Sequence, residues 1–372
     1  MTWACVLIAA IVLTPGISAT ASDSKAIFAL NERQWHLIYL KALNAHAISR
    51  GEGVLVAVLD SGVDPHPDLS ENLVPGTDII PGGSGNGLGD RDGHGTGMAG
   101  LIAAKSKDPA RGALGIAPKA KILPIYASPA HQDGTSEALA KGIDYAVSHH
   151  AQVISISAAG SADAQLQRAI RSAINANIVV VAAAGNASRS PLVGYPASEP
   201  GVVAVGGSDQ RGSHATVSVA GPEIDVVAPA VDIYSTGLNG GYRVGTGTSD
   251  AAAIVAGAAA LIRSKYPHLP AAEVAHRLTA TAIDKGPPGR DNEYGYGVID
   301  LVAALTADVP PIGFESTGVT PPASTAAGPD TGDGGSTARG FATLGVLLAA
   351  GGGYLVWRRR RRAGDSPPRI SR

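Results

Sequence analysis

The chain has 372 residues, of which 45% are hydrophobic and 16% charged, a composition that suits one large folded domain with a sizeable core. Its formal net charge of −2 gives no global bias toward nucleic acid, so no nucleic-acid partner is expected. The only cysteine, Cys5, lies in an N-terminal segment that we expect to be removed, which excludes a disulfide in the mature protein.

The N-terminus has the pattern of a secretory signal peptide. Residues 6–14 form an apolar run, which is followed by Pro15-Gly16 and the small-residue site Ala19-Thr-Ala21. The basic residues that usually precede such a run are missing, and an N-terminal core helix is the alternative. Residues 1–21 are predicted to be a signal peptide, which implies export. Residues 22–46 are then a helix-prone N-terminal extension, too short to fold alone and expected to pack on the main domain.

Residues 47–308 alternate between apolar runs typical of buried strands and segments typical of helices. The strands are expected at 54–59, 120–126, 153–157, 178–183, 202–205 and 225–228. The helices are expected at 94–104, 136–149, 163–176, 249–266 and 271–281. This alternation predicts one α/β domain with a mainly parallel central sheet and helices on both faces.

The C-terminal region changes composition twice. Residues 309–339 are rich in Pro, Gly, Ser and Thr, which predicts a disordered linker. Residues 340–357 carry no charge and precede five arginines, Arg358 to Arg362. As a helix they would cover roughly 27 Å, enough for a transmembrane helix with a stop-transfer signal. The prediction is a single-pass protein of the cell membrane, with an extracytoplasmic domain and a basic cytoplasmic tail at 358–372. The alternative, a buried helix with a nucleic-acid-binding tail, fits poorly with three consecutive glycines at 351–353.

Three residues that can carry chemistry lie in unusual settings. Asp60 ends the first predicted strand, His94 stands between glycines where a helix begins, and Ser249 follows a glycine-hinged turn at the start of a small-residue helix. Each has an ordinary alternative role, such as a turn residue for Asp60 or a helix N-cap for Ser249. In a parallel sheet, however, ligands bind at the carboxyl ends of the strands. A serine nucleophile needs a base such as histidine, and an aspartate can orient that histidine.

Other motifs are weaker. Gly95 to Gly100 matches the G-x-G-x-x-G pattern of dinucleotide-binding proteins, but a loop precedes it where a strand is required. The G-x-S-x-G signature of α/β-hydrolases is absent around Ser249. Asp90 and Asp92 are conceivable metal ligands, although two loop carboxylates are usually solvated. We therefore expect neither a cofactor nor a metal.

Five separated motifs, in order, resemble those of the subtilisin-type (S8) serine peptidases. They are Val58–Val63, Asp92–Thr96, Val180–Asn186, Gly194–Ala197 and Gly247–Ser249, and the resemblance covers about residues 50–305. It implies a three-layer subtilisin-like fold and a catalytic triad of Asp60, His94 and Ser249. It also implies an oxyanion hole made by the side chain of Asn186 and the backbone N–H of Ser249.

The same resemblance implies where a substrate binds. A peptide would pair with Ser157, Ala158, Ala159 and Gly160. The first specificity pocket would be lined by that segment together with Ala183, Gly185 and Gly194. Because these residues are small and uncharged, an apolar P1 residue is expected.

Two residues depart from the family pattern. Asp250 follows the nucleophile where the family commonly has an apolar or aromatic residue, and Ala253 stands where it usually has proline. A carboxylate at that distance would oppose a developing oxyanion by about 1 kcal/mol and could raise the pKa of His94. A weakly active or inactive scaffold that keeps the peptidase fold is therefore the alternative function.

The chain termini resemble those of the mycosins, membrane-anchored peptidases of actinobacterial type VII secretion. The resemblance rests on the signal peptide, the lack of a long prodomain, the Arg33–Leu37 segment and the C-terminal anchor, although the mycosin cysteines are missing. It implies protein or peptide substrates and a possible secretion-complex partner. Gly328–Gly332 resembles a sortase signal with its leucine replaced, so attachment to the cell wall is the alternative to a membrane anchor.

Overall fold

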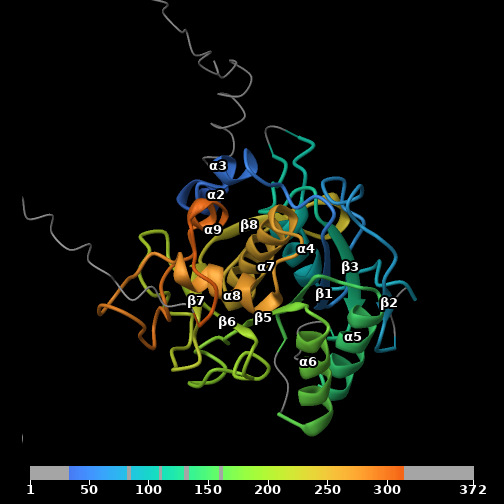
Figure 1. Cartoon of the computed structure of the whole chain (residues 1–372). Coiled ribbons are helices and arrows are strands. Elements are labelled where there is room, and N and C mark those ends of the chain that lie inside the picture. Colours follow the sequence, from blue (N-terminus) through green and yellow to red (C-terminus); the bar gives the residue numbers. More distant parts are fainter. Residues whose placement is uncertain (1–32, 82–84, 109–110, 130–133, 159–161, 314–372) are drawn as a thin grey trace, which may run out of the picture. The chain divides into compact units, whose positions relative to one another are not determined.

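The structure is a computed structural model that describes residues 33–81, 85–108, 111–129, 134–158 and 162–313 (Figure 1). The predicted signal peptide, transmembrane helix and cytoplasmic tail lie outside these residues, as does all of the predicted linker except its first five residues. Within the described ranges, no helix has the length and apolar character needed to cross a bilayer.

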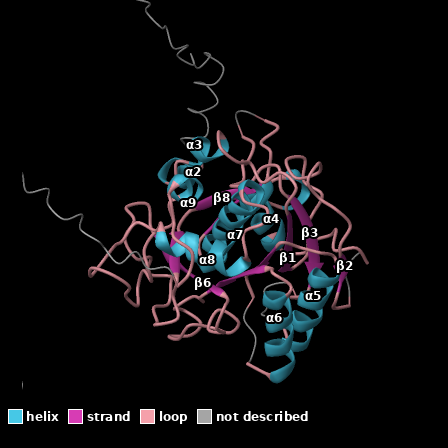
Figure 2. Cartoon of the chain, viewed as in Figure 1, coloured by secondary structure: helices cyan, strands magenta, loops and turns pink. Residues whose placement is uncertain are grey.

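A seven-stranded parallel sheet forms the middle layer (Figures 1 and 2). Its strands lie in the order β2-β3-β1-β4-β5-β6-β7. Their bounds are β1 Leu55–Asp60, β2 Thr77–Asp78, β3 Lys121–Tyr126, β4 Val153–Ile156, β5 Val179–Ala183, β6 Val203–Ser208 and β7 Val226–Pro229. The strand order changes direction at β1, because β1 pairs with β3 on one side and with β4 on the other. The carboxyl end of β1 is thus a topological switch point, where α/β proteins bind ligands.

Helices cover both faces of the sheet, which confirms the predicted α/β architecture. One face carries α5 Ser136–Ser148 and α6 Ala164–Asn175, and the other carries α4 His94–Ala103, α7 Thr248–Lys265 and α8 Ala271–Ala280. Alternate residues of β1 point to opposite cores: Val56 and Val58 toward α4 and α7, Ala57 and Leu59 toward α5. Every residue of α7 from Asp250 to Arg263 is buried, so this helix forms the centre of its core.

An antiparallel hairpin that the sequence did not predict packs on α4. It consists of β8 Ile233–Thr236 and β9 Tyr242–Gly245, joined by the short 3-10 helix η1 Leu238–Gly240. A Cβ atom on Gly97 or Gly100 of α4 would collide with side chains of this hairpin. These two glycines of the G-x-G-x-x-G match therefore serve close packing between the helix and the hairpin.

Residues 33–46 pack on the domain through two short helices, α2 Trp35–Tyr39 and α3 Ala42–His46. The amide of Gln34 donates to the Leu114 carbonyl oxygen and accepts from the Leu114 N–H, both at 2.9 Å. The helix α3 also contacts α9 Leu301–Thr306, near the end of the described chain. Residues 33–46 are therefore an integral part of the folded domain.

Candidate active site

A cleft of about 540 Å³ opens at the carboxyl ends of the central strands. It is lined by all the site residues predicted from the sequence that the structure describes: Asp60, His94, Ser157, Ala158, Ala183, Gly185, Asn186, Gly194 and Ser249. Ala159 and Gly160 lie outside the described residues. Polar and charged residues that were not predicted, including Ser128, Arg189 and Arg243, also line the cleft.

Asp60 and His94 form a short hydrogen bond. The Nδ1 atom of His94 lies 2.7 Å from Oδ1 of Asp60, which ends β1 and is buried. A carboxylate oxygen can only accept, so Nδ1 carries the hydrogen and Nε2 is directed to the opposite side of the ring. The Ser61 N–H also donates to Asp60 Oδ1, at 2.8 Å. The Asp60 carboxylate is thus held in place by the backbone of the turn that follows β1, and it can orient the imidazole of His94.

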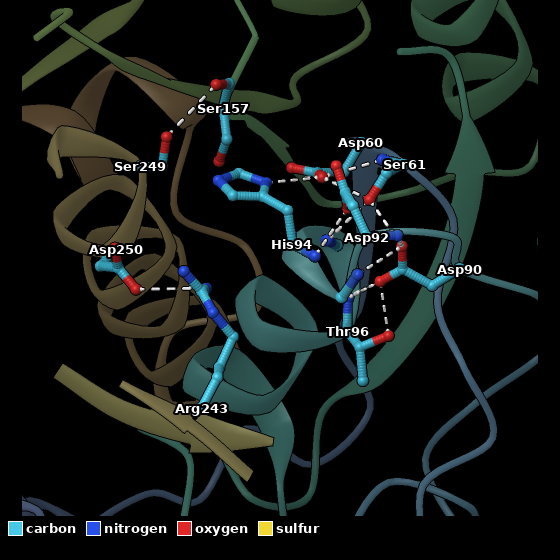
Figure 3. Close-up of polar contacts among 12 residues, drawn as sticks. Asp60, Ser61, Asp90, Asp92, His94, Thr96, Ser157, Arg243, Ser249 and Asp250 are labelled. Atoms are coloured by element: carbon cyan, nitrogen blue, oxygen red, sulfur yellow. Dashed lines mark hydrogen bonds and ion pairs between the residues drawn. The ribbon is translucent and has the colours of Figure 1, made fainter. Parts of the chain in front are cut away.

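Asp90 holds the loop before His94 and the first turn of α4. Its Oδ1 accepts from the Ser61 hydroxyl at 2.8 Å and from the Gly93 N–H at 3.1 Å, and its Oδ2 accepts from the N–H and hydroxyl of Thr96 (Figure 3). Burial raises the pKa of Asp90, while these hydrogen bonds oppose that rise. Asp90 is therefore a hydrogen-bonded structural residue, unlike the solvated carboxylate expected from the sequence.

Ser249 is the second residue of α7, two positions after the N-cap residue Gly247. The helix begins at Thr248, and its N-cap residue is Gly247, which has no side chain to accept from the first turn. The helix-cap alternative for Ser249 is therefore wrong. Its hydroxyl donates instead to the Ser157 carbonyl oxygen at 3.3 Å, on the cleft side of the helix (Figure 3). Its backbone N–H belongs to the first turn, where an α-helix offers no internal acceptor.

Asn186 follows β5 and is fixed by the residue before Ser249. Its Oδ1 accepts from the Thr248 N–H at 3.0 Å and from the Thr248 hydroxyl at 3.2 Å. The same hydroxyl accepts from the Gly185 N–H at 3.1 Å. Because the carbonyl end of the Asn186 amide is held in this way, its NH₂ end is left to face the cleft. Thr248 was not singled out from the sequence, where it reads as one small residue of a turn.

The electrostatics of the cleft favour a charged imidazole. The neighbouring Asp60 carboxylate is the main cause that raises the pKa of His94 to about 9, and burial and Arg243 oppose that rise. Asp250 makes a smaller contribution in the same direction as Asp60. This effect of Asp250 was expected from the sequence, whereas that of Arg243, which lies on the unpredicted hairpin, was not.

The comparisons with known proteins agree with this geometry. The Peptidase_S8 profile, described as the subtilase family, matches residues 51–297. Subtilisin DY from Bacillus licheniformis is 40% identical over 260 residues, which cover 68% of this chain and 92% of that protein.

Solved structures are similar as well. The crystal structure of MycP1 with its N-terminal propeptide removed has a TM-score of 0.68 and 34% identity, covering 75% of this chain and 98% of that one. The MycP3 protease from the type VII (ESX-3) secretion system has a TM-score of 0.66 and 34% identity, covering 74% of this chain and 88% of that one. The chain belongs to the subtilase family and is a subtilisin-like serine protease.

Proposed function

We propose that this protein is an extracytoplasmic endopeptidase, anchored to the membrane by residues 340–357, that cleaves proteins through Asp60, His94 and Ser249. The observation that carries the triad is the 2.7 Å contact between Asp60 and His94 in the same cleft as Ser249. Rotation about the Cα–Cβ bond of Ser249 would move its hydroxyl from the Ser157 carbonyl oxygen toward His94. Such hydrogen bonds often tighten only when substrate is bound.

Each group then has a defined task in acyl transfer. The Ser249 oxygen attacks the peptide carbonyl carbon as its proton moves to Nε2 of His94, and Asp60 stabilises the resulting imidazolium. The Asn186 side chain and the Ser249 N–H donate to the oxyanion. When the C–N bond breaks, His94 protonates the leaving amine and Ser249 holds the acyl group as an ester. Water, deprotonated by His94, then hydrolyses the ester and regenerates Ser249.

Labelling with a fluorophosphonate tests the nucleophile. The folded protein is expected to be labelled at Ser249, whereas Ser249→Ala and heat-denatured protein are not. Ser190 lines the same cleft and provides the matched control, since Ser190→Ala should keep full labelling. Absence of labelling in the folded protein would support the inactive-scaffold alternative.

The specificity pocket is proposed to accept apolar P1 residues. Ala158, Ala183, Gly185 and Gly194 line this part of the cleft and carry no charge. Leu192, which is 71% exposed, adds an apolar side chain to the cleft lining. A P1 peptide library should therefore be cleaved best after apolar residues. A maximum at Lys, Arg, Asp or Glu would contradict this pocket assignment.

The proposed setting is the cell surface, with a partner in a secretion complex. Support comes from the signal-peptide pattern, the uncharged 340–357 segment and the similarity to MycP1 and MycP3, proteases described as parts of type VII secretion systems. Membrane fractionation of the chain and of a variant ending at residue 339 tests the anchor. The full chain should sediment with membranes and retain its arginine tail, and the shortened one should be released. Loss of the tail from the surface-bound protein would favour sortase attachment instead.

A further inference from the structure

The carboxylate that follows Ser249 is paired with an arginine. Asp250 is only 2% exposed, and its Oδ1 lies 3.6 Å from Nη1 of Arg243, a residue of β9. Both atoms are buried, and neither makes a hydrogen bond within the described residues. The Asp250 carboxylate therefore relies mainly on Arg243, whose side chain is 27% exposed, because a buried ion that loses its partner is strongly destabilising.

Two glycines leave room for this pair. A Cβ on Gly245 would lie 2.5 Å from Oδ1 of Asp250 and 2.8 Å from Nη2 of Arg243. A Cβ on Gly97 of α4 would lie 2.8 Å from Cδ of Arg243. Figure 3 shows the guanidinium reaching from the hairpin toward Asp250, beside the helix that carries His94. The pair therefore occupies the space between the helix of the base and the helix of the nucleophile.

Charges from three elements around the cleft face Asp250. Asp250 faces Arg243 of β9, His94 of α4 and Asp60 of β1. Burial raises the pKa of Asp250, whereas Arg243 and then His94 act to lower it. Arg243 and Asp250 also act in opposite directions on the pKa of His94. Arg243 thus offsets the repulsion that a carboxylate next to Ser249 would exert on an oxyanion.

We propose that Arg243 and Asp250 are positioning residues of the peptidase, forming a buried pair that holds α7 against α4 and neutralises the charge behind the nucleophile. This inference rests on the proposed triad. It assigns a function to the residue that departs from the family pattern. It also explains how an acidic side chain next to the nucleophile is compatible with peptide hydrolysis.

The main test is the pH dependence of kcat/KM in single and double variants. Asp250→Asn keeps the shape of the side chain and leaves Arg243 uncompensated, so the acidic limb should move to lower pH by about 0.5 to 1 unit. The double variant Arg243→Met/Asp250→Asn removes both charges and should return the limb to within about 0.2 unit of the wild type. A purely structural role would alter the thermal midpoint and leave the limb in place.

A second pair supplies the matched control. Arg290 and Asp225 form an ion pair at 3.8 Å outside the cleft, so Asp225→Asn likewise leaves an arginine uncompensated. This variant should not move the limb. An equal movement in Asp225→Asn, no movement in Asp250→Asn, or no return in the double variant would each overturn the inference.

Positioning is tested separately by Arg243→Met and Arg243→Lys. The methionine variant should lose about tenfold in kcat with little change in KM, because a small displacement of Ser249 from His94 slows the chemical step. Arg243→Lys keeps a cation and should recover part of that loss. An unchanged kcat in Arg243→Met would contradict the positioning role. Fluorophosphonate labelling of the wild type shows whether a negative result refutes the triad or only the role of the pair. If Ser249 is not labelled, the proposed triad is wrong. If Ser249 is labelled, the triad stands and only the role proposed for Arg243 and Asp250 is wrong.

Discussion

Lowering the pH from 7 to 5 is expected to destabilise the fold through His36 in α2. This imidazole is completely buried, and neither of its ring nitrogens makes a hydrogen bond within the described residues. Burial lowers the pKa of His36 from 6.5 to about 3. The unfolded chain therefore binds a proton that the folded chain does not, and stability is lost as the pH falls below 6.5 toward 3.

The magnitude follows from this pKa difference. At pH 5, about 1.5 pH units below 6.5, and at about 1.36 kcal/mol per unit, the cost is about 2 kcal/mol. His36→Leu removes the titrating group from this completely buried site. The variant should lose about 2 kcal/mol less than its parent between pH 7 and pH 5. Part of the pH dependence should persist, because burial also lowers the pKa of His46.

Urea unfolding of proteins carrying Ser249→Ala measures this effect without self-digestion. The exposed His149 provides the control, and His149→Gln should keep the parental pH dependence. If His36→Leu lost as much stability as its parent between the two pH values, the assignment of a neutral, buried His36 would be refuted.

Three further predictions concern catalysis. Because the pKa of His94 is raised to about 9, the base is protonated at neutral pH, and kcat/KM should rise with pH up to about 9; a half-maximal value below pH 7 would contradict this. Asn186→Leu should lower kcat by about 10²–10³ with little change in KM, since it removes an oxyanion donor; a loss seen only in KM would argue against that role. Thr248→Val should lower kcat about tenfold because it removes one of the two hydrogen bonds that hold the Asn186 amide, whereas Thr248→Ser should retain activity; equal losses in both variants would assign the effect to packing.

The sequence predicted six of the seven strands because they are almost continuously apolar, and helices such as α6 because their apolar residues recur at helical spacing. The hairpin was missed because neither of its strands forms a continuous apolar run. Its sheet is only two-stranded, and it is stable where it is because α4 packs against it. Tertiary contact, rather than local pattern, thus determines this part of the fold.

The proposed catalytic residues were visible from the sequence because they sit in glycine-rich turns at strand ends and helix starts. The roles of Thr248 and Arg243 could not be predicted, because each depends on contact with a residue that lies elsewhere in the chain. One signal was available: Asp250 heads a helix of alanines and valines that had to be buried. A carboxylate in such a place requires a cation nearby, and the sequence offered no way to choose which one.

The burial of α7 has a consequence for how this protein can diversify. The proposed nucleophile, Ser249, belongs to a buried helix, whereas Ala158, Leu192 and Gly194 belong to loops at the rim of the cleft. Exchanging these loops for those of a relative would replace the proposed specificity pocket without altering helix α7. The protein is therefore a suitable recipient for loop grafting, in which the substrate selectivity changes and the catalytic residues stay in place.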